Sequence, residues 1–262
     1  MASGTQIHKL KVADYMTDNP ITIQFRATFP EAVTIMATKG IGNLIVTENR
    51  NVVVGLLTER EILQYLSLNR EIPNKNIEYT ALQSFSKISP DDTIYAAAKS
   101  MISNKTRLLV FEDNKNNRLA GIITASDIVR AFRKTDSNPP VEDVMSNKIF
   151  DLAYNNSILM AVKILRKRRI GSVIVTKDEK PYGIFTERDL LTKVLSKGVE
   201  LDEKVGDYCT TPLITTQRGI RANEAANIMF TNNMKRLPLT QDGKIVSIVT
   251  ARDLVEALQE EH

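Results

Sequence analysis

Several residue types that carry chemistry are scarce in this chain. It has one cysteine, Cys209, and two histidines, His8 and His262, among 262 residues. A single cysteine cannot form an internal disulfide, and so few histidines argue against a zinc site and against histidine acid–base catalysis. There is no tryptophan, and aromatic residues make up 6% of the chain. A groove of stacking aromatics for single-stranded nucleic acid is therefore not expected.

Long apolar runs are missing as well. No stretch approaches the ~18 residues that a membrane span requires, and the first residues lack the apolar core of a secretory signal. Together with the lone cysteine, this predicts a cytoplasmic location. The 35 basic and 31 acidic residues give a mixed surface with a net charge of +4, which argues against a nucleic-acid partner. No nucleophile–base pair, glycine-rich phosphate loop or metal cluster is visible, so neither an enzyme nor a metal site is predicted.

One short string is present four times and defines the fold. The copies are GLLTEREI from Gly55, GIITASDI from Gly121, GIFTERDL from Gly183 and SIVTARDL from Ser247. An extended stretch, a helical pattern and two β-like runs precede each threonine, and a second helix starts there. The first helices are predicted to have their N-caps at Thr28, Asp92, Ser157 and Arg221. The sequence thus predicts a mixed α/β protein of four β-α-β-β-α repeats.

The repeats are expected to pair, because a unit with a three-stranded sheet buries too little apolar surface to be stable alone. The most turn-prone link, residues 135–140, lies between repeats two and three. We therefore predict two modules. The first covers 1–136 with repeats 10–70 and 79–134, and the second covers 139–262 with repeats 141–197 and 205–259.

The order of elements and the Gly-hydrophobic-hydrophobic-Thr-x-x-Asp string resemble the CBS (cystathionine β-synthase) domain family, whose tandem pairs are called Bateman modules. Four copies without a catalytic or channel domain resemble the gamma subunit of AMP-activated protein kinase. The resemblance implies a disc of two Bateman modules that binds AMP, ADP or ATP between paired repeats. It also implies a regulatory energy sensor, in which the nucleotide changes the packing of the modules and an effector protein reads that change.

The threonine and the acid of each string form a capping-box pattern, and helix capping alone would explain one such pair. However, three repeats also place an arginine in the first helical turn, where positive charge opposes the helix dipole. A phosphate at the helix N-terminus would account for it, and the acid would then accept the ribose hydroxyls. The predicted phosphate-binding residues of the strings are Thr58, Arg60, Thr124, Ser126, Thr186, Arg188, Thr250 and Arg252. The predicted ribose-binding residues are Glu61, Asp127, Asp189 and Asp253.

Two further sets come from the resemblance. Basic residues near the start of each middle strand would reach phosphate, namely Arg107, Arg168, Arg169, Lys235 and Arg236. Residues of the first and middle strands would surround adenine, namely Thr22, Ile41, Ile149, Gly171 and Ile214. Read without the resemblance, these are surface, core or turn residues. The resemblance implies that Arg169 matches Arg107 and Arg236, and that repeat one has Gly40 at this place. Repeat four has the fullest set, whereas repeat one departs from the pattern with Gly40 and Glu61.

Two alternatives stay open, S-adenosylmethionine and nucleic acid. The cationic sulfonium of the first does not suit repeated arginines. The sequence also leaves open which nucleotide is preferred, and whether the chain is a monomer or a homodimer.

Overall fold

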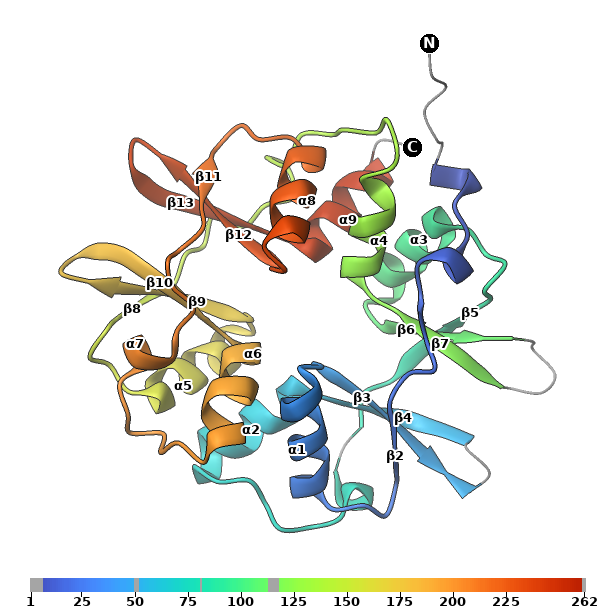
Figure 1. The fold of residues 1–262 in the computed structure, drawn as a ribbon, viewed down its shortest axis with the longest axis horizontal. Helices are drawn as coiled ribbons and strands as arrows, with labels where there is room; N and C mark the ends of the chain where they lie inside the picture. The colour runs from blue at the N-terminus through green and yellow to red at the C-terminus, as the bar shows by residue number, and fades with distance from the viewer. Residues whose placement is uncertain (1–6, 50–51, 81, 113–117, 261–262) are drawn as a thin grey trace. The chain divides into compact units, whose positions relative to one another are not determined.

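The computed structural model describes residues 7–49, 52–80, 82–112 and 118–260. His262, which the argument against histidine chemistry included, lies outside the described residues. Within them, the four predicted β-α-β-β-α repeats are present, and the mixed α/β class is confirmed (Figure 1).

Each repeat consists of a short first strand, a first helix, two longer strands and a second helix. Repeat one comprises β2 (Thr22–Gln24), α1 (Phe29–Lys39), β3 (Asn43–Glu48), β4 (Val52–Thr58) and α2 (Glu59–Asn69). Repeat two comprises β5 (Phe85–Ile88), α3 (Ile94–Asn104), β6 (Arg107–Phe111), β7 (Leu119–Ile123) and α4 (Ala125–Phe132). Repeat three comprises β8 (Asp151–Ala153), α5 (Ile158–Arg168), β9 (Ser172–Lys177), β10 (Lys180–Thr186) and α6 (Glu187–Asp189), which continues as a π-helix over Leu190–Val194 and a 3-10 turn over Leu195–Lys197. Repeat four comprises β11 (Thr216–Gln217), α8 (Ala222–Thr231), β12 (Arg236–Gln241), β13 (Lys244–Thr250) and α9 (Ala251–Glu260).

The sheets follow from this order of elements. In every repeat the first strand is parallel to the middle strand, because a helix connects them, and the last strand is antiparallel to the middle one. Repeat two has a fourth strand, β1 (Thr17–Asp18), which pairs with β7. Short helical turns over Ile7–Lys9, Val12–Asp14 and Ile77–Tyr79 and the helix α7 (Val205–Tyr208) lie in the connecting segments.

The predicted starts of the first helices are largely confirmed. Thr28 and Ser157 cap α1 and α5, accepting the N–H of the residue three positions on, and Arg221 is the N-cap residue of α8 without a capping side chain. The prediction of Asp92 as an N-cap is wrong, because Thr93 caps α3 and accepts from the N–H of Ala96. The Asp92 carboxylate instead accepts from the N–H of Ser89 at 2.8 Å, which closes the preceding turn.

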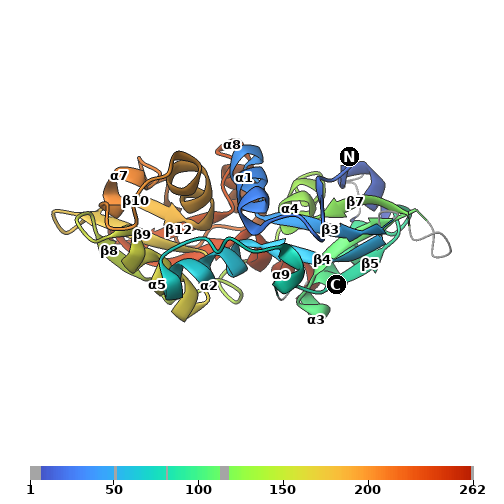
Figure 2. The same ribbon diagram turned by 90° about the horizontal axis from the view of Figure 1, so that it is seen from below.

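The chain divides into two compact units. Unit 1 consists of Met1–Pro20, Ser84–Ile149 and Ile214–His262, and so contains repeats two and four. Its apolar core is formed mainly by α3, α4, α8 and α9, and α9 contacts the other three helices. Unit 2 consists of Ile21–Gln83 and Phe150–Leu213, and so contains repeats one and three, with α2 packed against α5 (Figure 2). The predicted modules 1–136 and 139–262 instead group repeat one with repeat two and repeat three with repeat four. That pairing of repeats stays a prediction.

The segments that lead into the repeats are exchanged between them. The segment that leads into repeat two pairs with the last strand of repeat one, through Gln83 and Leu56. Conversely, β1 leads into repeat one and pairs with β7, the last strand of repeat two. The same exchange links repeats three and four, through Thr210 with Ile184 and through Ser146 with Ile248. Within each predicted module, the two repeats therefore depend on each other's leading segment.

Candidate functional site

The threonine and the acid of every string cap the second helix. In repeat one, the main-chain N–H and the hydroxyl of Thr58 both donate to Oε2 of Glu61, each at 2.8 Å. In repeat four, the N–H of Thr250 donates to Oδ2 of Asp253 at 2.8 Å, and the N–H of Asp253 donates to Oγ1 of Thr250 at 3.3 Å. Repeats two and three have the same reciprocal pair. One carboxylate oxygen of each acid is thus used to fix the start of the helix.

The other oxygen of the carboxylate distinguishes the repeats. In repeat one, Oε1 of Glu61 accepts from the amide of Gln83 at 2.7 Å. In repeat two, Oδ1 of Asp127 faces the guanidinium of Arg130 at 3.4 Å. In repeat three, Oδ1 of Asp189 accepts from Lys193 and Thr210, both at 2.7 Å. Three of the four predicted ribose-binding acids therefore already hold a side-chain donor.

Asp253 of repeat four is different. Among residues 7–49, 52–80, 82–112 and 118–260, no side chain donates to its Oδ1. Burial raises the pKa of this carboxyl, against the lowering effect of its hydrogen bonds to Thr250. A partly buried carboxylate with one unused oxygen is a strong acceptor for a hydroxyl of a ligand.

The strand register places two of the predicted basic residues beside the strings. Arg236 is the first residue of β12 and lies directly opposite Thr250 in the ladder, and Arg107 is the first residue of β6. The matching residues of repeats one and three are Asn43 and Ser172, which pair with Thr58 and Thr186. The side chains of Asn43 and Ser172 carry no charge, so repeats one and three have no basic residue at this place.

The expected correspondence of Arg169 with Arg107 and Arg236 is therefore wrong. Arg169 lies three residues before β9, where it caps the end of α5 in the left-handed conformation (φ 54°). Gly40 was expected at the same place in repeat one, which Asn43 holds instead, and Gly40 caps the end of α1 (φ 61°) as Arg169 caps α5. Arg168 is the last residue of α5, and its guanidinium lies over the ring of Phe150. Lys235 precedes β12, and its carbonyl accepts the N–H of Ala251 at 2.9 Å.

The remaining arginines and hydroxyls lie where the sequence places them, in the first turns of the second helices. Arg252 is partly buried, and its guanidinium is 3.5 Å from the carbonyl of Met101 in α3. Arg60, Ser126 and Arg188 hold the same helical position in the other three repeats.

The predicted adenine-binding residues fall in both compact units. Thr22 begins β2, Ile41 and Gly171 lie in the turns before β3 and β9, and all three belong to unit 2. Ile149 and Ile214 belong to unit 1, and Ile214 packs against its core. Gly171 has a main-chain role, because its carbonyl accepts the N–H of Glu187 at 3.2 Å. The adenine assignments stay predictions.

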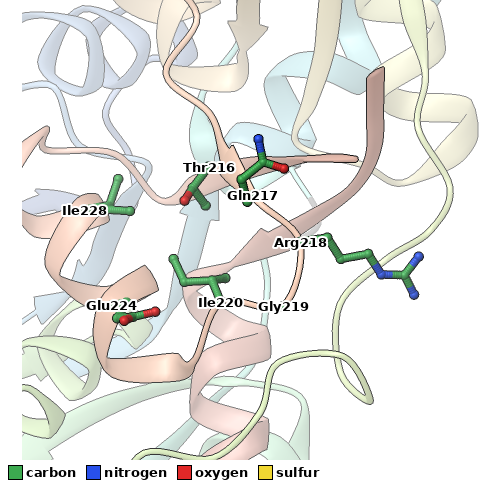
Figure 3. A pocket seen from close by; sticks show the side chains of 7 residues that line it. All are labelled: Thr216, Gln217, Arg218, Gly219, Ile220, Glu224 and Ile228. Carbon is green, nitrogen blue, oxygen red and sulfur yellow. The ribbon is translucent and has the colours of Figure 1, made fainter. Parts of the chain in front are cut away.

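An open hollow of about 420 Å³ lies elsewhere in repeat four, between the end of β11 and the start of α8 (Figure 3). The residues that line it are Thr216, Gln217, Arg218, Gly219, Ile220, Glu224 and Ile228. In Figure 3 the guanidinium of Arg218 points away from Ile220 and Glu224. None of the residues predicted to contact nucleotide lines this hollow. Its position therefore gives no support to the predicted site.

Sequence reasoning missed the side chains that occupy the second carboxylate oxygen. Arg130 and Lys193 follow their acids by three and four residues, a helical spacing at which ion pairs form, so the sequence contained a signal for them. Gln83 and Thr210 lie 22 and 21 residues after their acids and carry no local signal.

No helix in the part of the chain that the structure describes is both long and apolar enough to span a membrane. Within those same ranges, no three histidine, cysteine, aspartate or glutamate side chains gather as metal ligands would.

Four β-α-β-β-α repeats, each with a threonine and an acid that cap the start of its second helix, define a tandem-repeat protein. The CBS domain family matches four segments of the chain, 12–68, 70–134, 141–196 and 205–260. The chain therefore belongs to the CBS domain family, as expected, and is a CBS-domain protein of the regulatory kind.

Several archaeal proteins are similar to it. Protein MJ1225 of Methanocaldococcus jannaschii is 29% identical over 188 residues, which are 65% of this chain and 67% of that protein. A 33.4 kDa protein of the ribosomal RNA operon of Thermofilum pendens is 28% identical over 208 residues, or 72% and 66% of the two chains. The matched part of this chain thus spans about two thirds of the length of each relative.

Two solved structures share the fold over 95% of this chain and 100% of their own. That of MJ1225, described as a candidate archaeal homologue of the AMP-activated kinase gamma subunit, has a TM-score of 0.76 at 18% identity. That of an uncharacterized conserved protein from Pyrococcus horikoshii has a TM-score of 0.65 at 22% identity. These likenesses agree with the fold and with the expected quadruple-CBS organisation.

Proposed function

We propose that the protein is a regulatory adenine-nucleotide sensor, and that AMP, ADP or ATP binds at repeat four. The observation that carries the proposal is Oδ1 of Asp253, to which no side chain of the described residues donates. This carboxylate can accept a ribose hydroxyl without first losing an internal partner, whereas Glu61, Asp127 and Asp189 would each have to exchange one. The differential cost favours repeat four.

The surroundings of Asp253 suit a phosphate. Arg236 lies across the ladder from Thr250, and Arg252 follows Thr250 by two residues. Two guanidinium groups in the same repeat give charge-assisted donors for phosphate oxygens, and a helix N-terminus adds a favourable field. The nucleotide would thus have its ribose at Asp253 and its phosphate towards the arginines. Its differential affinity for two arrangements of the modules would carry the signal to an effector protein.

Thermal melting and calorimetric titration with AMP, ADP and ATP test the proposal. Free ligand at about 100 times its dissociation constant should stabilise the fold by roughly 2.7 kcal/mol. Asp253→Ala should remove most of that shift. If none of the three nucleotides at millimolar concentration moves the transition of the unaltered chain, the proposal is wrong.

A further inference from the structure

The carboxylate of Glu59, the first residue of α2, occupies the place that a side chain at Gly42 would take. A Cβ built on Gly42 would lie 2.6 Å from Oε1 and 2.7 Å from Oε2 of Glu59. The N–H of Glu59 also donates to the carbonyl of Gly42 at 3.3 Å. The glutamate therefore fills the gap between the turn before β3 and the start of α2, and the glycine makes room for it.

The same pair of residue types is found in repeat three and in neither of the other two. Gly171 precedes β9, Glu187 begins α6, and the N–H of Glu187 donates to the carbonyl of Gly171 at 3.2 Å. Repeats two and four instead begin the second helix with alanine and have a side chain at the glycine position. These residues are Thr106 with Ala125 in repeat two and Lys235 with Ala251 in repeat four.

The first residue of the middle strand follows the same division. Arg107 and Arg236 occupy it in repeats two and four, and Asn43 and Ser172 occupy it in repeats one and three. Around the start of the second helix, repeats two and four thus have basic residues without a glutamate, whereas repeats one and three balance one arginine with one glutamate. The division coincides with the two compact units, because unit 1 holds repeats two and four.

From these positions we infer that Glu59 and Glu187 determine specificity, and that repeats one and three reject phosphorylated nucleotides while repeats two and four accept them. The inference rests on the proposed function. A carboxylate in the first turn satisfies the helix dipole as a phosphate would, and it repels a phosphate brought to the same gap. Repeats one and three therefore already contain the anion that the helix start favours.

Native mass spectrometry with AMP counts the bound molecules and tests the inference. The unaltered chain should bind at most two AMP, and both should be lost in the double variant Asp127→Ala/Asp253→Ala. In Glu59→Gln/Glu187→Gln, which keeps side-chain volume, additional AMP should bind, with roughly tenfold or more higher affinity at repeats one and three. Binding of adenosine, which has no phosphate, should be the same in this variant as in the unaltered chain.

The outcomes separate the inference from the proposed function. Glu48→Gln, at the exposed end of β3, is the matched control and should leave the AMP count unchanged. If AMP remains bound to Asp127→Ala/Asp253→Ala but is lost from Glu61→Ala/Asp189→Ala, the inference is overturned and nucleotide sensing stands. If the unaltered chain and every variant bind no AMP, both are overturned. Thermal melts of each variant establish that it is folded.

Discussion

Lys193 and Asp189 form an ion pair in repeat three, with 2.7 Å between Nζ and Oδ1. The hydroxyl of Thr210 joins them, because it donates to the same oxygen and accepts from Lys193 at 2.8 Å. Lys193 lies in the π-helical turn that follows directly after the capping box. Asp189 is therefore satisfied on both oxygens, and it is 4% exposed. Among the residues that the structure describes, the equivalent acid of repeat four, Asp253, has only its capping bonds with Thr250.

This difference predicts unequal effects on stability. Asp189→Ala should lower the free energy of unfolding by about 2–3 kcal/mol, because it removes the ion-pair partner of Lys193 and the acceptor of the Thr210 hydroxyl. Asp253→Ala should cost about 1 kcal/mol, the usual effect of losing a helix cap. Chemical denaturation of the two variants measures both values. Equal losses would contradict the view that the two carboxylates have different roles.

Asp253 variants should separate capping from nucleotide binding. Asp253→Ala should weaken binding by about 1.5–3 kcal/mol, roughly tenfold or more, because a charge-assisted hydrogen bond is lost. Asp253→Asn is the matched control for the cap, since its amide oxygen can still accept the N–H of Thr250. It should retain more stability than the alanine variant and still bind nucleotide less tightly than the unaltered chain. Calorimetric titration and thermal melts provide the two readouts.

Arg252→Ala should weaken AMP binding while leaving stability unchanged or slightly improved. The guanidinium stands in the first turn of α9, where it opposes the helix dipole, and its bond to the carbonyl of Met101 is long at 3.5 Å. The comparison is a pair of calorimetric titrations, with AMP and with adenosine. A variant that loses affinity for both ligands equally would show that Arg252 does not act on the phosphate.

The raised pKa of Asp253 predicts a pH dependence with a definite sign. An acid whose pKa is higher in the folded than in the unfolded chain adds stability that is fully present below the unfolded value, and this stability is lost as pH rises through the folded value. Ribose hydroxyls favour the charged form, so nucleotide binding should release a proton and strengthen as pH rises through the same range. Titrations in acidic buffers should show this trend in the unaltered chain. The trend should be absent in Asp253→Asn.

The glycine that opens each string should resist substitution where it contacts a leading segment. A Cβ on Gly183 would lie 2.7 Å from both Sγ of Cys209 and the carbonyl oxygen of Thr210. Gly183→Ala should therefore cost about 1–3 kcal/mol by denaturation. Ser247 holds this position in repeat four, and its buried hydroxyl has no hydrogen-bond partner among the described residues. Ser247→Ala is the matched control and should be neutral or stabilising.

Much of the fold could be predicted from the sequence because the pattern is repeated. The string beginning at Gly55 alone allows several structures, but four copies at a regular spacing fix the order of strands and helices. The N-cap of α3 was predicted wrongly because two adjacent residues are both suited to cap a helix. Asp92 and Thr93 can both cap a helix, and the pattern does not determine which one does.

The site was harder to predict, because its decisive contacts are long-range. The capping role and the ligand role of Asp253 use different oxygens of one carboxylate, which a one-dimensional pattern cannot distinguish. Whether the second oxygen is occupied depends on residues such as Gln83 and Thr210, which the fold brings from a neighbouring segment. The resemblance puts Arg169 in the place of Arg107 and Arg236, and only the strand register shows that Ser172 holds that place.

The division of the chain into interleaved stretches has a consequence for its synthesis. Unit 2 needs residues up to Leu213, and unit 1 needs α8 and α9 from the last stretch, so neither hydrophobic core can close on the first half of the chain. A nascent chain released to residue 136 would expose the apolar surfaces of α2, α3 and α4 that α5, α8 and α9 cover in the folded chain. Because such surfaces aggregate and distant contacts form slowly, the emerging chain should depend on chaperones until its final helices have left the ribosome.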